Sequence, residues 1–293
     1  MTALSPLFDP QLWERMLTSP FMARSVIVAV LVGVSAPIIG TYLVQRRLSL
    51  LGDGIGHVSL TGVALGWLIG SWLGTADPGA LAIPGAMVTA VAGSIIIEVV
   101  RRRGSATGDL ALALLFYGGI AGGVLLMGLA GGSTGNLNSY LFGSIASVSW
   151  TDVWWTIALA VVLLGVGIGL RPALFSLTHD EEFATAQGLP VVALTMLVAI
   201  TSALTVATAM RVVGVLLVSA LMIVPVAVAQ LFMPSFRSTM RLAQGLGLVV
   251  CVLGLVLSYI YPLSSGATIV VILIVIYFVA AGIQPSFARL RRR

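Results

Sequence analysis

The sequence contains no lysine, and this absence excludes one class of energy-converting protein. All 15 basic residues are arginines. A Walker A phosphate-binding loop needs a lysine that reaches the phosphates of the nucleotide, so this chain cannot be a P-loop ATPase by itself. The sequence also shows no catalytic triad and no zinc-protease motif, and we therefore do not expect an enzyme.

Charge is scarce throughout the chain. Only 9% of the 293 residues are charged, whereas 59% are hydrophobic and the mean hydropathy is +1.10. A soluble domain carries about a quarter charged residues, so the composition predicts an integral membrane protein in contact with the lipid bilayer. The net charge of +5 does not indicate nucleic-acid binding, because the arginines cluster between apolar segments.

Cysteine occurs once, as Cys251 within an apolar run. A single cysteine excludes a disulfide framework within the chain and any metal motif built from cysteines. We expect Cys251 to be a small buried hydrophobic residue.

Nine apolar segments of about 20 residues, the length that crosses a bilayer as a helix, recur along the chain. They predict an all-α polytopic membrane protein with about nine transmembrane helices (eight to ten) in a single domain, residues 1–293. Met210 and Arg211 alone separate the sixth span from the seventh, which makes that boundary the weakest. The expected spans are 23–44, 50–73, 80–99, 109–131, 150–170, 190–210, 212–233, 242–260 and 267–283.

The arginines fall mostly at alternate connections between spans, and this placement predicts the orientation. The connections that carry them, with the basic tail 284–293, are expected to be cytoplasmic, and the N-terminus is expected outside. Residues 1–21 are expected to contain an interfacial amphipathic helix. The arginines that set the orientation are Arg46, Arg47, Arg101, Arg102, Arg103, Arg171, Arg237, Arg241 and those of the tail, whereas Arg15, Arg24 and Arg211 fall elsewhere.

Asp53 and His57 are the most informative polar residues, because they lie inside an otherwise apolar span. Residues four apart on a helix share one face, and ionisable groups at membrane depth are expensive. A carboxylate and an imidazole make half a site for a divalent transition metal, to which water, nearby Ser or Thr, or a second subunit would add ligands. The alternative is a hydrogen-bonded pair that only locks two helices together.

Three other features of the spans have structural or functional interpretations. Asp53 is about one helical turn from Arg47, so the span either begins below the membrane surface or is partly re-entrant. The span from Gly214 to Ala229 contains Ser219 and Pro225, and a proline-kinked helix can line a transport path. Glycine stripes favour close helix packing over a gating role; they are Gly62, Gly66, Gly70 and Gly74 in the second span and Gly118, Gly119, Gly122 and Gly123 in the fourth.

Residues 178–189 form the largest polar connection. Its acidic start and its glycine predict a short helix that begins near Asp180 and ends at Gly188. The segment is either a solvated loop helix or a docking surface for a cytoplasmic partner. Elsewhere, Glu98 and Asp109 flank a run of three arginines, and we expect salt bridges or a helix-terminal role for them rather than contact with a substrate.

Taken together, these features resemble the permease subunits of the zinc and manganese ABC importers, from about residue 20 to residue 283. Five motifs occur in the order of that family. They are Arg46-Arg47 with Gly52-Asp53, His57 and Thr61-Gly62; Tyr140 to Ser144; Asp180, Glu182, Ala184 and Gly188; Val213 to Pro225; and Ser265 to Ile269. The departures are Gly54 and Gly56, where the family often has larger residues, and His179 before the acidic element.

The resemblance implies a permease with the ABC importer fold in the cell (inner or cytoplasmic) membrane. Two copies would form one path, a cytoplasmic ABC ATPase would dock on a coupling helix at 178–189, and an extracytoplasmic metal-binding protein would deliver the ion. Zinc or manganese would be the cargo, with zinc slightly favoured, no cofactor would be permanently bound, and ATP would bind the partner chain. Asp53 and His57 would contact the ion, and Asp180, Glu182, Ala184 and Gly188 would belong to the coupling helix.

Two other functions also fit the residues. An ion-coupled secondary transporter would use Asp53 as a proton relay, and its uptake would depend on a proton gradient without an ATPase partner. A non-transporting membrane scaffold would use Asp53 and His57 only to pin helices, so that His57→Ala would harm folding rather than uptake.

Overall fold

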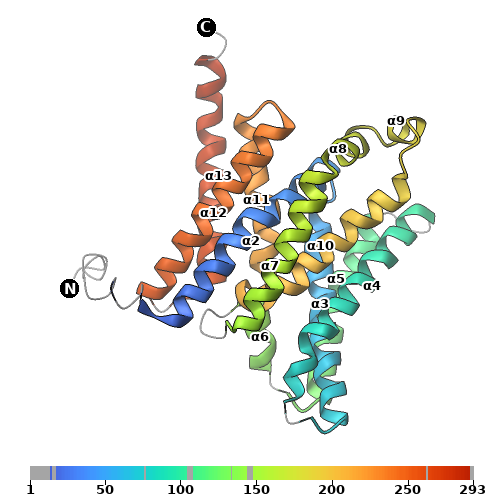
Figure 1. Ribbon diagram of the computed structural model, residues 1–293, viewed down its shortest axis with the longest axis vertical. Coiled ribbons are helices and arrows are strands. Elements are labelled where there is room, and N and C mark those ends of the chain that lie inside the picture. The colour runs from blue at the N-terminus through green and yellow to red at the C-terminus, as the bar shows by residue number, and fades with distance from the viewer. Residues whose placement is uncertain are drawn as a thin grey trace.

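The computed structural model describes residues 14, 18–75, 77–103, 108–132, 134–143, 148–261 and 263–290. Within these ranges every regular element is helical, and nine helices are long and apolar enough to cross a membrane (Figure 1). The prediction of an all-α polytopic protein is thus confirmed. The interfacial helix expected within residues 1–21 falls largely outside the described residues, as do the last three residues of the tail.

The spans are α2 (Pro20–Gln45), α3 (Ser49–Trp72), α4 (Ala82–Arg103), α5 (Gly108–Leu129), α7 (Trp150–Leu164), α10 (Val191–Val213), α11 (Val215–Phe232), α12 (Phe236–Ile260) and α13 (Ser265–Leu290). A 3₁₀ turn, η2 (Pro78–Leu81), precedes α4, and a π-helical turn, η4 (Gly165–Gly169), extends α7. Three shorter helices are α6 (Thr134–Phe142), α8 (Arg171–His179) and α9 (Glu181–Ala186).

Helix α3 lies inside the bundle, where α4 and α5 pack along it and α10 and α11 also contact it (Figure 1). In its most apolar stretch 67% of α3 is buried, against 22% for the peripheral helix α13. This difference indicates that α3 faces other helices of this chain, whereas most of the surface of α13 is left uncovered by them. Cys251 is fully buried in α12, as expected.

Glycines allow the close contact between α3 and α4. A Cβ atom on Gly62 would collide with the backbone of Gly85, and one on Gly66 would collide with the carbonyl of Leu81. Small residues that let two backbones approach are typical of helix interfaces in membranes. The structure therefore supports packing as the role of these two glycines.

The boundary between the sixth and seventh spans lies at Gly214, not at Met210–Arg211 as the sequence analysis placed it. Gly214 has φ of +87°, a conformation that residues with a Cβ avoid, and it separates α10 from α11. Arg211 belongs to α10. The correction has a physical reason: one glycine can reverse the chain between two apolar helices without any polar loop.

Three of the motifs behind the resemblance meet around Gly214. A Cβ atom on this residue would touch the backbone of Phe142 and Gly143 at the end of α6. One on Gly266, at the start of α13, would touch the carbonyls of Phe142 and Val213. Motifs far apart in the sequence therefore share one close backbone contact, which explains the glycines at positions 214 and 266.

Helices α8 and α9 lie together at one end of the bundle (Figure 1). The predicted short helix is present as α9, whose N-cap is Asp180 and which is followed by Gly188 with φ of +76°. Helix α8 was not predicted, and it includes the first two residues of the range 178–189. We call this end, which carries Arg46, Arg101, Arg102 and Arg171, the arginine-rich end.

Candidate functional site

Asp53 and His57 both lie on α3, in its second and third turns. The helix runs without interruption from Ser49, so the segment is not re-entrant. Because the two side chains belong to the same helix, their contact does not join two helices. The pair lies next to the corner that connects α2 to α3.

The side chains of Asp53 and His57 lie close together but do not form a hydrogen bond with each other. His57 Nε2 lies 3.8 Å from Asp53 Oδ1, which is longer than a hydrogen bond. The imidazole is 5% exposed and the carboxylate is 29% exposed. The carboxylate therefore keeps hydrogen-bonding capacity that its neighbour on the helix does not use.

Ser219 of α11 is the third polar group at the site. Its Oγ lies 3.3 Å from Asp53 Oδ1 and 2.8 Å from the carbonyl oxygen of Val215. One hydroxyl proton serves one acceptor at a time, and the shorter bond goes to the backbone. From the sequence, Ser219 was identified only as a residue of a proline-containing span. No pattern in the sequence around it indicates a contact with Asp53, which is 166 residues away.

A cavity of about 200 Å³ lies beside Asp53. One water molecule occupies about 30 Å³ in the liquid, so the cavity is large enough for an ion with part of its hydration shell. Gly54 lines this space and has no side chain to occupy it; a Cβ atom there would lie in ordinary van der Waals contact with Leu112, 3.5 Å away. The other lining residues are Leu50 of α3 and Ala113, Phe116 and Tyr117 of α5.

His57 carries a buried nitrogen with unused bonding capacity. Its Nδ1 finds no hydrogen-bond partner among the described residues. The ring contacts the edge of Phe116, with 4.2 Å between ring centroids, and Gly119 lets α5 approach the backbone of His57. Buried polar atoms in folded proteins are nearly always satisfied, so this nitrogen has capacity for a further partner, as does Trp67 Nε1, the other buried nitrogen without a partner among the described residues.

The described part of the chain does not bring three or more His, Cys, Asp or Glu side chains into one group that could hold a metal. Asp53, His57 and Ser219 thus supply one carboxylate, one imidazole and one hydroxyl. A transition metal usually takes four or more ligands. The described residues of this chain therefore provide an incomplete set.

The four residues assigned to coupling have different environments. Asp180 Oδ1 accepts a hydrogen bond of 2.8 Å from the backbone N–H of Phe183, Ala184 is buried, and Gly188 ends the element. These three residues shape α9. Glu182 faces outward beside Phe183, whose side chain is 56% exposed and which the sequence analysis did not single out.

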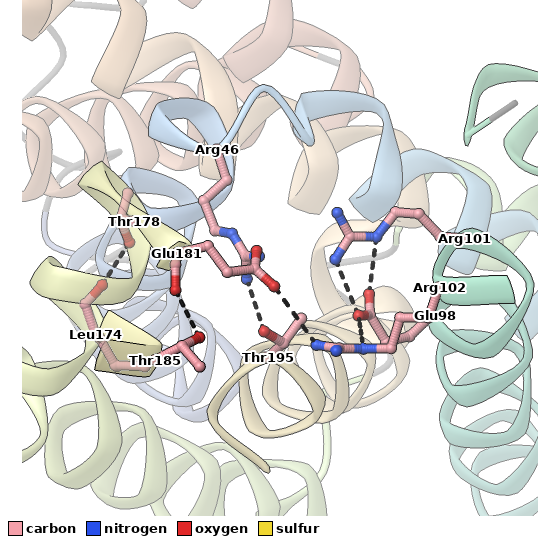
Figure 2. Close-up of polar contacts among 9 residues, drawn as sticks. All are labelled: Arg46, Glu98, Arg101, Arg102, Leu174, Thr178, Glu181, Thr185 and Thr195. Atoms are coloured by element: carbon pink, nitrogen blue, oxygen red, sulfur yellow. Dashed lines mark hydrogen bonds and ion pairs between the residues drawn. The ribbon is translucent and has the colours of Figure 1, made fainter. Parts of the chain in front are cut away.

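A network of charged side chains occupies the arginine-rich end (Figure 2). Glu98 accepts hydrogen bonds of 2.9 Å from Arg101 and 2.6 Å from Arg102, which confirms its expected salt bridge. Glu181 accepts one of 2.9 Å from Arg46, a residue far away in the sequence. The side chain of Asp109 is outside the described set, so its predicted role is not tested.

The fold and the site together define a class of protein, a multi-pass membrane permease with a polar pair in a buried span. Residues 18–284 match the family model described as the ABC 3 transport family. The chain belongs to this family.

Relatives of known name agree with this assignment. The manganese transport system membrane protein MntC of Listeria monocytogenes is 31% identical over 276 residues, which cover 93% of this chain and 94% of that protein. The manganese import system permease protein ScaB of Streptococcus parasanguinis is 33% identical over 267 residues, 91% of each chain. The structure of PsaBC from Streptococcus pneumoniae in complex with Fab superposes with a TM-score of 0.79 at 29% identity, covering 92% of this chain and 94% of that one.

Proposed function

We propose that this chain is the membrane permease of an ATP-driven importer whose cargo is a divalent transition metal, with manganese favoured. The observation that carries the proposal is the open Asp53–His57 pair, with an orphaned imidazole nitrogen, beside a cavity of about 200 Å³. Membership of the ABC 3 transport family supports it. The names of the relatives support manganese.

The slight preference for zinc in the sequence analysis has no support among these relatives. Oxygen ligands suit manganese, whereas imidazole binds zinc and several other metals. The site offers two kinds of oxygen, from Asp53 and Ser219, and one imidazole. We therefore rank manganese before zinc.

The proposed mechanism uses the incompleteness of the site. Asp53 and His57 bind the ion in transit, Ser219 Oγ contributes a third atom or orients the carboxylate, and water in the cavity completes the coordination. An ion held by few protein ligands can leave again. A second copy of the chain forms the other wall of the path, and alternating access opens the site first to the outside and then to the cytoplasm.

The arginine-rich end is the proposed cytoplasmic face, by the positive-inside rule. On this face α9 presents Glu182 and the exposed ring of Phe183 to a separate ABC ATPase, which binds the ATP. An extracytoplasmic metal-binding protein delivers the ion to the opposite face. In this orientation the N-terminus lies outside and the C-terminus lies in the cytoplasm.

The decisive experiment measures manganese uptake into proteoliposomes that contain this chain, its ATPase and its binding protein. We expect ATP-dependent accumulation by the native assembly and a loss of at least about tenfold in Asp53→Asn, because neutralising the carboxylate removes the only charged ligand. The matched control is Asp77→Asn, the same chemical change at an exposed turn, where the amide oxygen can still accept the 2.9 Å bond from Gly79 N–H.

Each outcome separates the candidate functions. Zinc in competition with manganese identifies the preferred cargo. Accumulation driven by a proton gradient without ATP would instead establish a secondary transporter. Native-like uptake by Asp53→Asn would contradict the site, and an absence of uptake from a fully assembled native complex would favour a scaffold.

A further inference from the structure

Arg46 is a buried cation at the arginine-rich end. It is the C-cap of α2, and its side chain is only 6% exposed. Its Nη2 donates a 2.9 Å hydrogen bond to Glu181 Oε2 on α9, and its Nη1 donates one of 3.2 Å to Thr195 Oγ1 on α10 (Figure 2). Burial lowers the pKa of Arg46, and the carboxylate of Glu181 opposes this shift. The buried charge of Arg46 therefore depends on a residue of α9.

The second oxygen of Glu181 faces another helix. Its Oε1 lies 4.0 Å from Arg102 Nη2, and Arg102 is in turn held by the buried Glu98 of α4 (Figure 2). Glu181 thus contacts the ends of two helices, α2 and α4, that flank the helix with the candidate metal site. Glu182, next to it on α9, has no ion pair within the part of the chain that the structure describes.

The connection from Arg46 to α3 is short and stiff. The backbone N–H of Leu48 donates a hydrogen bond to the carbonyl of Leu43, and that of Arg47 donates one to the carbonyl of Val44. This pair of hydrogen bonds at the C-terminal end of a helix is a Schellman motif. Arg47 adopts φ of +58° to close it. These bonds fix the backbone of the corner, which leads directly into the first turns of α3, where Asp53 lies.

We propose that Glu181 is a positioning residue that transmits the movement of α9 to the Asp53–His57 site through Arg46 and the α2–α3 corner. The inference rests on the proposed function, since it assumes that an ATPase displaces α9. It assigns different tasks to two adjacent acids: Glu182 faces the partner chain, and Glu181 faces inward. Neither Glu181 nor Arg46 contacts the cargo.

The test compares two adjacent arginines in the reconstituted complete transporter. Arg46→Gln removes the partner of Glu181, whereas Arg47→Gln removes the same charge from the exposed neighbouring position. The readout is the number of manganese ions imported per ATP hydrolysed, with co-purification of the ATPase measured in parallel. We expect Arg46→Gln to lower this ratio by about fivefold or more, in the range of coupling between distant sites, and Arg47→Gln to change it by less than about twofold.

A double-mutant cycle separates transmission from a general structural role. If Glu181 acts through Arg46, the double variant with Arg46→Gln and Glu181→Gln loses no more than either single variant, whereas independent effects multiply. Glu181 is 45% exposed, so Glu181→Gln carries the test if Arg46→Gln fails to fold, with Asp77→Asn in its exposed turn as the control.

The failure of this inference differs from the failure of the proposed function. A native ratio of ions to ATP in Arg46→Gln or Glu181→Gln, in a complex whose native form imports manganese, would overturn the inference alone. Multiplied losses in the double variant would also overturn it. No uptake by the native complex would overturn the proposed function and this inference with it.

Discussion

Two charged clusters lie close to the α2–α3 corner, and they differ in how completely their polar atoms are paired. At the first, Asp53 Oδ1 is 3.8 Å from His57 Nε2 and 3.3 Å from Ser219 Oγ, and a buried nitrogen is left over. At the second, Glu98 and Glu181 accept bonds of 2.6 to 3.1 Å from their arginines. Charge-assisted bonds of that length are strong and geometrically specific.

The difference indicates different roles for residues of similar type. A carboxylate that already accepts short charge-assisted bonds has little capacity for a further ligand. A carboxylate with unused acceptors, beside a cavity, has capacity for a cation. The same chain thus contains Asp53, which is suited to hold an ion, Glu181, which joins α9 to α2, and Glu98, which is paired within its own helix α4.

The largest effect is expected when α5, which lines the cavity beside Asp53, is pushed away from α3. In Gly119→Val the added side chain would overlap the backbone of His57, so α5 must move away from α3. We expect a loss of about 1–3 kcal/mol in unfolding free energy, together with loss of manganese uptake. Thermal unfolding in detergent and uptake assays measure both.

The matched control for this change is Gly118→Val, one residue earlier on α5. An added Cβ at Gly118 meets no atom of the described residues within 4 Å, because it points outward. We expect this variant to remain close to the native protein in stability and uptake. Equal losses in the two variants would show that any larger residue weakens α5, and the specific contact with His57 would then be wrong.

A smaller effect is expected when the ion pairs of Glu98 with Arg101 and Arg102 are removed. Glu98→Gln keeps the shape of a side chain that is 4% exposed but removes the charge that pairs with Arg101 and Arg102. Both arginines are about 30% exposed and remain partly hydrated. The cost should therefore be on the order of 1 kcal/mol, measured by denaturation.

The control for Glu98→Gln is Glu182→Gln, which removes an equal charge from an exposed position on α9. This substitution should change stability by less than about 0.5 kcal/mol. If Glu98→Gln were as stable as Glu182→Gln, the ion pairs of Glu98 with Arg101 and Arg102 would not stabilise the end of α4.

Local sequence pattern was sufficient to predict the membrane-spanning helices and to single out the first two residues of the candidate site. Apolar length predicts each span because a bilayer fixes how long a helix must be. Asp53 and His57 were identifiable because ionisable groups are rare in such segments and four-residue spacing puts them on one face. The salt bridge of Glu98 was predictable for the same reason, since its arginines are three and four residues away.

Contacts between distant segments were not predictable from one sequence. Ser219 reaches Asp53 across 166 residues, and Glu181 reaches Arg46 across 135. Neither serine nor glutamate differs locally from others of its kind in this chain. The turn at Gly214 was missed because φ of +87° and the close approach of α6 are properties of the tertiary fold, and no polar loop marks them.

The smallest effect is expected from Ser219→Ala, which tests how much the Ser219 hydroxyl contributes to the candidate metal site. The hydroxyl bonds more closely to the carbonyl of Val215 than to Asp53, at 2.8 Å against 3.3 Å. Its loss should raise the KM for manganese only about two- to threefold, corresponding to on the order of 0.5 kcal/mol. The control is Ser59→Ala on α3, where a buried hydroxyl donates its hydrogen bond to the carbonyl of Ile55 and not to Asp53. A loss of a hundredfold in Ser219→Ala would mean that this oxygen is a full metal ligand, and the site would then be more nearly complete within one chain than its geometry indicates.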